Sequence, residues 1–513
     1  MKQRLINLLL SSFKTLRFAA VAATPSTVPN GVQPFEAIPG PRGRTSLPYI
    51  GPMFLFHPFT AHTLEQSNLV FTELNKKYGS IVKLRNGKKW SIFLFDPDYV
   101  EQAFWYEGKF PERTSMPLWE TYCRRKKRRP GLSLMQGDQW NKVRKAVQIQ
   151  TSKPAVVCRY LPSHLEVADD FVQCIAQEVN SGTPMENLIM EYTAESTAHY
   201  CFNSRFGFLD RSDKETYEKN QTFLKNVDKF LSLIAHSFYT FPVFKYYPTQ
   251  LYKEFETAAD LIFGVAERDV EREYLKLNKC PLSNHDQPNL LQALLQDKRL
   301  EKETVLSLTG GFFAVATENV AKVLTTLLWN LAKHQSKQDI LYQEIKDTCT
   351  TKDGITTEIL SRMPYLKSCF KETCRIVFPT PVGTVRVIQE NCTIGGYYIP
   401  AGTIAHIANN TMCRNPKYFD DPDIYEPERW LRKSNTTLKR RQSFIVLPFG
   451  FGPRSCVGRH FAEHQIYVAV IKLLLRYRIT LTNPDEELEV FYKILATLKT
   501  PLNLQFEERN NNR

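Results

Sequence analysis

Residues 449–458 read FGFGPRSCVG, and this stretch decides how the rest of the chain is interpreted. Glycines at positions 450, 452 and 458 allow the backbone to turn tightly around Cys456, so that amide hydrogens can point at its sulfur. A helical pattern with apolar residues from Ala462 to Leu474 follows, and the N-terminus of that helix adds positive potential. Both effects favour a thiolate over a thiol. A lone cysteine at a Gly-rich turn is more often an ordinary buried residue, so the surrounding pattern has to decide.

The full pattern F-G-x-G-x-R-x-C-x-G is present, and it resembles the haem-binding signature of the cytochrome P450 family. The resemblance covers almost the whole chain. It implies a mainly α-helical fold with a minor β-sheet, haem b as cofactor, and Cys456 as the axial ligand of the iron. A thiolate ligand donates electron density that promotes cleavage of the O–O bond of dioxygen. Phe449 and Arg454 would also lie at the haem, with Arg454 neutralising a propionate.

Two further elements of the family precede the cysteine. Glu372 and Arg375 lie three residues apart on a predicted helix, hence on one face, although such pairs are usually solvated. The tetrapeptide PERW at 427–430 matches the family's P-E-R-F/W element. The resemblance implies that Glu372, Arg375 and Arg429 form a buried ion triad that holds the loop before Cys456, which is a structural role and not a catalytic one.

The haem propionates have three more candidate partners. Trp140 and Arg144 match the family's W-x-x-x-R, one helical turn apart, and the segment PVGTVR at 381–386 matches the strand that follows the triad helix. The resemblance implies that Trp140, Arg144 and Arg386 contact propionates and that residues 382–385 face the substrate.

One long apolar helix is predicted over Glu303–Lys333, with an acid near its middle. The family shows A/G-G-x-D/E-T there, and this chain keeps the acid as Glu318 but has Asn319 in place of the alcohol. An amide relays protons poorly, whereas a hydroxyl both donates and accepts them. Thr317 lies about 200° around the helix from position 319, so it replaces the alcohol only if the helix is distorted. A substrate hydroxyl or an ordered water is the other candidate relay, and Glu318 is alternatively a buried structural residue.

Short strand patterns at 81–84, 90–95 and 394–404, with helical periodicity between them, predict a mostly helical body with a minor sheet. A Pro/Gly-rich stretch predicts the domain boundaries: residues 1–37 as a leader, 38–52 as a hinge and 53–513 as one catalytic domain. The leader contains Lys2, Arg4, Lys14 and Arg17 and no acid before Glu36. It is therefore typical of a mitochondrial presequence, with a membrane-surface anchor or a disordered tail as alternatives.

The net charge and the cysteine content indicate which kinds of binding partner and which compartment to expect. The net charge of +14, without a zinc-finger spacing or another nucleic-acid signature, favours an anionic membrane surface or an acidic protein over nucleic acid. The 11 cysteines form no CxxC pair, which suits a reducing compartment.

Docking of an electron-donor protein is predicted at Lys367 and Lys371, on one face of the triad helix, and at Arg459 after the cysteine motif. Together with the leader these residues resemble the mitochondrial class of the family, whose donor is an acidic [2Fe-2S] ferredoxin reduced by an NADPH-dependent reductase. That class commonly has a second Arg after the first, where this chain has His460, so the match is incomplete. Surface lysines that are merely solvated are the alternative.

Membrane contact is predicted from a second resemblance. Residues 152–172 look like the mitochondrial steroid and vitamin D hydroxylases, which associate peripherally with the matrix side of the inner membrane through an apolar loop. The apolar segment 231–244 is the candidate loop, unless it is ordinary core. The basic run RRKKRR at 124–129 is predicted to be a solvated loop or a contact with anionic lipid, not a nuclear import signal. The surface of the endoplasmic reticulum membrane is the alternative location.

These inferences predict a monooxygenase that inserts one oxygen atom from O2 into a hydrophobic substrate, a sterol, steroid or related lipid. Two alternatives are kept. A reductase-independent isomerase or dehydratase acting on a lipid peroxide would explain the missing alcohol at Asn319, and a non-enzymatic haem-binding sensor or carrier would need no electron donor.

Overall fold

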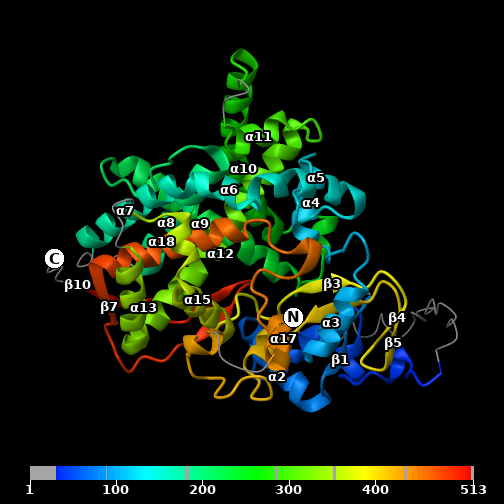
Figure 1. Cartoon of the computed structure of the whole chain (residues 1–513). Coiled ribbons are helices and arrows are strands. Elements are labelled where there is room, and N and C mark those ends of the chain that lie inside the picture. The colour runs from blue at the N-terminus through cyan, green and yellow to red at the C-terminus, as the bar shows by residue number, and fades with distance from the viewer. Residues whose placement is uncertain are drawn as a thin grey trace.

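The computed structural model describes residues 30–87, 89–178, 184–282, 287–349, 354–431 and 436–509. The predicted presequence therefore lies outside the described residues, except for its last eight positions. The described chain is mainly α-helical with small β-sheets, as predicted (Figure 1).

The body is built from the long helix α12 (Lys302–Lys333) and further helices of seven or more residues in the described part of the chain. They are α2 (Ser67–Tyr78), α3 (Pro97–Trp105), α4 (Pro117–Arg125), α5 (Gly137–Thr151), α7 (Leu161–Glu178), α8 (Met185–Phe202), α9 (Lys214–Ser237), α10 (Gln250–Lys279), α11 (Leu290–Gln296), α13 (Gln335–Thr348), α15 (Pro364–Ile376), α17 (Thr436–Ile445) and α18 (Arg459–Arg476). Shorter helices are α6 (Pro154–Val157), α14 (Thr357–Ser361) and α16 (Asn409–Cys413).

The main sheet has four strands in the order β1-β2-β6-β3. Strands β1 (Ile81–Asn86) and β2 (Lys89–Leu94) are antiparallel, β2 pairs in parallel with β6 (Ile404–Ile407), and β3 (Val385–Val387) pairs antiparallel to β6. The early strand predictions at 81–84 and 90–95 thus coincide with β1 and β2. Three two-stranded sheets complete the fold, formed by β4 (Cys392–Ile394) with β5 (Tyr397–Ile399), β7 (Tyr477–Leu481) with β10 (Leu504–Glu508), and β8 (Val490–Tyr492) with β9 (Ala496–Leu498).

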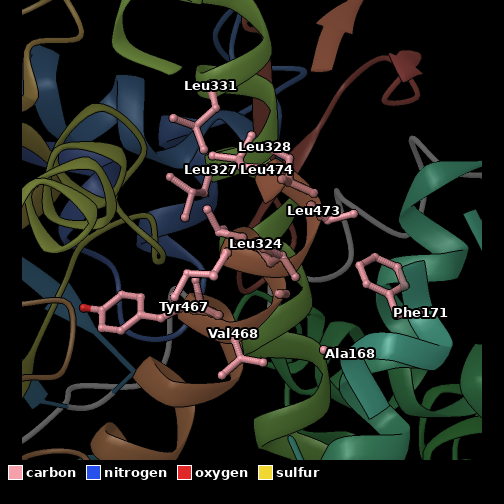
Figure 2. Packing of buried hydrophobic residues seen from close by; sticks show 14 of the residues in the cluster. Ala168, Phe171, Leu324, Leu327, Leu328, Leu331, Tyr467, Val468, Leu473 and Leu474 are labelled. Atoms are coloured by element: carbon pink, nitrogen blue, oxygen red, sulfur yellow. The ribbon is translucent and has the colours of Figure 1, made fainter. Parts of the chain in front are cut away.

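Helix α12 is the centre of the hydrophobic core. Figure 2 shows its leucines at 324, 327, 328 and 331 packed with residues of α18 and α7, among them Leu474 and Phe171. In the described part of the chain, α12 is the one helix long and apolar enough to cross a membrane, but 67% of its most apolar window is buried inside the protein. Helix α12 is therefore the core helix of the fold, and Glu318, near its middle, is buried inside the protein.

The Pro/Gly-rich segment before β1 lies against the main sheet. Phe35 and Ile38 are buried in the same cluster as residues of β2 and β6. Gly40 approaches the backbone so closely that a Cβ there would lie 2.1 Å from the carbonyl oxygen of Lys83. These contacts extend the packed body to the N-terminal side of residue 53, while the predicted domain boundaries themselves stay predictions.

The segment predicted to contact the membrane, 231–244, divides into two parts. Leu231, Leu233 and Ile234 continue α9 and are buried, because the apolar face of that helix packs on α10 and α12. Of the large apolar residues after α9, Phe238 and Phe241 are exposed, at 45% and 60% of their surface, whereas Phe244 is buried. The prediction was wrong for the first part of the segment, which is core.

The basic run at 124–129 is also more structured than predicted. It begins as the last turn of α4, and three of its side chains form ion pairs. Lys126 and Arg128 pair with carboxylates of α10, and Arg129 pairs with Glu301 directly before α12. The prediction of a solvated loop was right in part, since residues 126–129 follow the helix and most of the run is exposed. It did not foresee that carboxylates of distant segments pair with three of the six charges.

Candidate haem site

The loop around Cys456 has the tight backbone that its glycines predict. The Cys456 N–H donates to the carbonyl oxygen of Phe449 at 2.7 Å and closes the loop. Gly450 and Gly452 have φ of +71° and +67°, in the left-handed region that favours glycine. A Cβ at Gly452 would also lie 2.6 Å from Glu107 Oε1. Gly458 differs from the prediction, because its φ of −95° is accessible to other residues.

The Cys456 side chain is exposed, yet the protein around it is dense enough to raise the pKa of the thiol above its ordinary value. The backbone N–H of Gly458 and the positive charges of Arg113 and Arg144 act in the opposite direction and favour the anion. Burial is the larger effect. The sequence predicted that the loop and its charges favour the thiolate, and in the structure they do not do so by themselves. A coordinated cation would supply the missing stabilisation, since metal coordination deprotonates thiols.

Arginines gather around the cysteine loop. Arg144 of α5 donates from Nη1 to the carbonyl of Ser455 at 2.8 Å. Arg386 of β3 donates from Nη2 to the carbonyl of Phe451 at 2.9 Å. Arg113, which carried no sequence signal, donates to the carbonyl of Arg454 at 2.7 Å. Three guanidinium groups from separate segments therefore converge on the loop that contains a fourth arginine, Arg454.

This arginine cluster, Arg113, Arg144, Arg386 and Arg454, has little negative charge to balance it. Within the described residues, Glu107 is the one carboxylate that pairs with any of the four, through Arg386. Burial and the neighbouring positive charges lower the pKa of Arg454 to about 9 and that of Arg113 to about 10. Uncompensated buried cations are costly unless anions pair with them. A ligand that brings two carboxylates next to an exposed sulfur fits these residues, and haem b is such a ligand.

The two aromatic residues predicted at the haem, Trp140 and Phe449, pack against residues of the cysteine loop or of the core next to it. Trp140 is buried, and the guanidinium carbon of Arg454 lies 3.9 Å from its ring centroid, a cation–π contact. Phe449 stacks on Phe370 of α15, with ring centroids 5.9 Å apart. Trp140 therefore orients an arginine, and Phe449 connects the loop to the core.

The structure brings together the three residues of the predicted triad. Arg375 donates to both oxygens of Glu372, each at 2.8 Å, and both side chains are fully buried. Arg429 Nε also donates to Glu372 at 2.8 Å, and the indole N–H of Trp430 donates to the second oxygen at 2.9 Å. Arg375 further donates to the carbonyl of Pro422. One carboxylate thus joins α15 to the loop that leads toward Cys456.

Glu318 is buried in α12, and its Oε2 has no hydrogen-bond partner in the described part of the chain. Burial, reinforced by Asp228, raises the pKa of Glu318 to about 8, while Lys322 and Lys493 oppose the shift. Lys322 Nζ and Lys493 Nζ lie 3.6 and 3.8 Å from the carboxylate of Asp228. The carboxyl of Glu318 is therefore protonated at neutral pH, and the charged side chains near it are partly exposed.

Asn319 does not replace the missing alcohol in this structure. Its Nδ2 donates to the carbonyl of Val315, four residues earlier in α12, at 2.6 Å. Thr317 is fully buried, and its hydroxyl has no partner in the described part of the chain. The helix is continuous over Lys302–Lys333, so no bulge moves Thr317 toward position 319.

A small cavity beside Asn319 offers another route for a proton. It has room for about one water molecule. Its polar lining comes from Asn319, Lys322, Thr326 and Thr373, and Leu495 and Ala496 of the C-terminal hairpin contribute apolar walls.

The three predicted donor-docking residues differ in environment. Lys367 is exposed, and its ammonium donates to the carbonyl of Ser361. Lys371 is half-buried, with its ammonium 3.9 Å from the centroid of Trp430. Arg459 is exposed but pairs with Glu463 at 2.9 Å. Only Lys367 therefore presents a fully available charge.

A long core helix with a buried acid, together with an exposed cysteine sulfur in a cluster of arginines, defines a haem-thiolate protein. The sequence profile described as Cytochrome P450 matches residues 41–507. The chain therefore belongs to the cytochrome P450 family. Members of this family bind haem b through a cysteine thiolate and act as monooxygenases, so the chain is an oxidoreductase with haem b as its cofactor.

Individual relatives agree with this assignment. A probable cytochrome P450, CYP44, of Caenorhabditis elegans is 31% identical over 470 residues, which cover 89% of this chain and 90% of the relative. The mitochondrial cholesterol side-chain cleavage enzyme of Hypanus americanus is 28% identical, with 84% and 83% covered. The mitochondrial 1,25-dihydroxyvitamin D(3) 24-hydroxylase of Rattus norvegicus is 27% identical, with 92% and 89% covered. The predicted resemblance to the mitochondrial class is confirmed.

Proposed function

We propose that this chain is a mitochondrial monooxygenase that inserts one oxygen atom into an apolar C–H bond of a sterol, steroid or related lipid. Its electrons come from a [2Fe-2S] ferredoxin and an NADPH-dependent reductase. The observation that carries the proposal is the exposed sulfur of Cys456 next to four arginines, of which only Arg386 pairs with a carboxylate in the described part of the chain. The names of the mitochondrial relatives support the substrate class and the organelle.

Haem b supplies activation of dioxygen when it is bound, and the protein supplies its ligand and its anchors. Cys456 holds the iron, and the N–H of Gly458 stabilises the sulfur as an anion. Arg144, Arg386 and Arg454 hold the propionates, with Arg113 as a fourth partner. The triad of Glu372, Arg375 and Arg429 keeps the loop before the cysteine in place.

Glu318 holds the proton that the reaction consumes. Because its pKa is raised to about 8, the carboxyl is protonated at neutral pH and can donate from a buried position. Asp228, Lys322 and Lys493 are each partly exposed, so they connect this carboxyl to solvent and can return a proton to it. Asn319 and a water in the adjacent cavity take the place of the usual hydroxyl.

A peripheral membrane site delivers the lipid substrate. Five exposed side chains after α9 form what we name the apolar patch: Phe238, Phe241, Val243, Tyr246 and Tyr247. Tyr49 of the N-terminal segment extends it, with its ring centroid 5.4 Å from that of Phe241. Exposed contiguous apolar and aromatic side chains are typical of membrane contacts. We place this surface on the matrix side of the inner membrane.

The ferredoxin docks beside the cysteine loop. Lys367 and Lys371 belong to α15, and Arg459 begins α18 directly after the cysteine motif. An acidic protein is attracted to such cations mainly during encounter, so they affect the rate of association more than the final affinity.

Reconstitution tests the proposal. The full chain, loaded with haem, is combined with ferredoxin, reductase and NADPH and offered a panel of sterols, and products are scored by a mass gain of one oxygen atom. Product that requires all three components supports the proposal. Turnover of a lipid hydroperoxide without ferredoxin or NADPH would instead support the isomerase or dehydratase, the second candidate that Asn319 favours. A matched Cys456→Ala protein should yield neither product.

A further inference from the structure

We infer that the basic end of α4, formed by Arg124, Arg125 and Lys127, binds the phosphate groups of an anionic phospholipid membrane next to the apolar patch. The inference rests on the proposed membrane association and adds the lipid class that the surface recognises. It concerns the basic run that the haem site does not use.

Half of the six positive charges in this run are neutralised inside the protein. Lys126 lies 2.7 Å from Asp260 and 3.3 Å from Glu256, both on α10. Arg128 pairs with Glu267 at 3.2 Å, and Arg129 pairs with Glu301 at 2.7 Å. These three side chains fasten α4 to its neighbours and are not free to bind a ligand.

The other three charges have no carboxylate partner among the described residues. Arg124 Nη2 donates to the carbonyl of Lys245 at 3.1 Å, and Arg125 Nη2 donates to the carbonyl of Phe244 at 3.0 Å. Arg125 is half-buried, and its guanidinium carbon lies 4.2 Å from the ring centroid of Tyr252. Carbonyl groups and an aromatic ring bring no carboxylate to these two side chains, so neither is paired with an anion. Lys127 is exposed, and its ammonium has no ion pair with a residue that the structure describes.

These charges lie directly against the apolar patch. The two carbonyls belong to the short 3-10 helix η6 (Val243–Lys245), which lies between the exposed rings of Phe241 and Tyr246. Tyr246 and Tyr247 are exposed over 89% and 69% of their surface. Tyrosine rings are enriched where a bilayer meets water, the depth at which lipid phosphates also lie. The cations therefore stand at headgroup level when the patch enters the acyl region.

An anionic membrane fits this combination better than an acidic protein or a nucleic acid. Stable peripheral binding requires an apolar anchor together with a basic patch, and both are present side by side. Two of the three residues proposed to meet the ferredoxin, Lys367 and Lys371, are on α15, which lies on a different part of the molecule from α4 (Figure 1). A nucleic acid would leave the exposed aromatic rings without apolar contact.

Vesicle binding tests the inference with the full chain. Affinity is measured for phosphatidylcholine vesicles with and without phosphatidylglycerol, at low and at high salt. Each cation near an anionic surface contributes about 1 kcal/mol, or about fivefold in affinity. We expect Arg124→Gln/Arg125→Gln/Lys127→Gln to lower affinity for the anionic vesicles on the order of 100-fold, to leave binding to neutral vesicles unchanged, and to abolish the salt dependence.

Two further variants separate charge from folding. Arg124→Lys/Arg125→Lys keeps the charges but changes the bonds to η6, and it should retain the preference for anionic vesicles. Lys214→Gln/Lys219→Gln/Lys225→Gln removes three exposed charges from the first half of α9 and should leave the preference unchanged. Equal binding of the wild-type protein to both vesicles would overturn this inference but not the membrane association. Failure to bind either vesicle would overturn both.

Discussion

Arg386 Nε donates to Glu107 Oε2 at 2.6 Å, and both side chains are buried. Glu107 also lies against the cysteine loop, where it leaves no room for a side chain at Gly452. One carboxylate thus balances part of a cluster of four arginines and shapes the loop at the same time. Without a further anion, the cluster repels itself, so its stability should depend on what binds there.

Replacing Glu107 should therefore lower the stability of the haem-free protein more than that of the haem-bound protein. Glu107→Gln keeps one hydrogen-bond acceptor but removes the negative charge, and we expect it to lower the free energy of unfolding of the haem-free protein by about 1–3 kcal/mol. The loss should shrink once haem is bound, because propionates supply two charges. Urea unfolding followed by circular dichroism measures both forms, with the exposed Glu65→Gln as control. An equal loss in both forms would contradict the explanation.

Cys456→Ala should abolish thiolate ligation without unfolding the protein. The Cys456 side chain is exposed and its backbone N–H still reaches the carbonyl of Phe449, so the loop can close without the sulfur. We expect the ferrous protein with carbon monoxide to lose the red-shifted absorption of a thiolate complex. Cys280→Ala, at the other exposed cysteine, should retain it. A normal spectrum in the Cys456 variant would remove the basis of the proposed function.

The parts of the site that could be predicted from sequence are those encoded by local spacing. The left-handed φ values of Gly450 and Gly452 require glycine, so the loop is visible in the sequence itself. Glu372 and Arg375 are three residues apart in a helix, and this spacing alone places them on one face. The strands β1 and β2 are neighbours in sequence and form a hairpin whose register follows from their apolar residues.

The parts that could not be predicted depend on contacts between distant segments. Arg113 and Glu107 lie in an irregular segment, where no periodicity marks them, and they become part of the site only because β3 and the cysteine loop pack there. The pairing of Lys126 with Asp260 joins residues 134 positions apart. Burial of Leu231 and Ile234 likewise depends on which helices cover α9, which an apolar run does not reveal.

Asn319→Thr should improve the coupling of NADPH consumption to product. The hydroxyl can both donate and accept a proton, whereas the amide of Asn319 donates to its own helix. We expect severalfold more product per NADPH in the reconstituted system. Asn330→Thr is the matched control, because Asn330 makes the same bond to the carbonyl four residues earlier in α12. Unchanged coupling would show that water or substrate already serves as the relay.

The two docking lysines should respond differently to loss of charge. Lys367→Gln should raise KM for ferredoxin about three- to tenfold with little change in kcat, because an exposed rim charge acts on association. Lys371→Gln should also lower the melting temperature, because its ammonium rests on the ring of Trp430. Steady-state kinetics at low salt and thermal unfolding measure the two effects, with Lys76→Gln on α2 as control. An unchanged KM for ferredoxin in both variants would mean that neither lysine belongs to the docking site.

Glu318 should make the stability of the protein fall as pH rises, and the sign follows from its pKa. The unfolded carboxyl ionises near its ordinary value of 4.5, whereas burial keeps the folded carboxyl protonated up to about 8. Between these values the folded state binds more protons than the unfolded state, so the free energy of unfolding decreases with pH. Glu318→Gln cannot ionise, so its stability should lack this decrease.

The difference between wild type and Glu318→Gln isolates this one group, because all other ionisable groups are shared. Below about pH 4.5 the two proteins should be similar in stability, and above about pH 8 the variant should be more stable by about 5 kcal/mol. Denaturant unfolding of both proteins across this range measures the difference. Parallel pH profiles for wild type and Glu318→Gln would mean that Glu318 ionises normally in the folded protein, and its role as a proton donor at neutral pH would then be untenable.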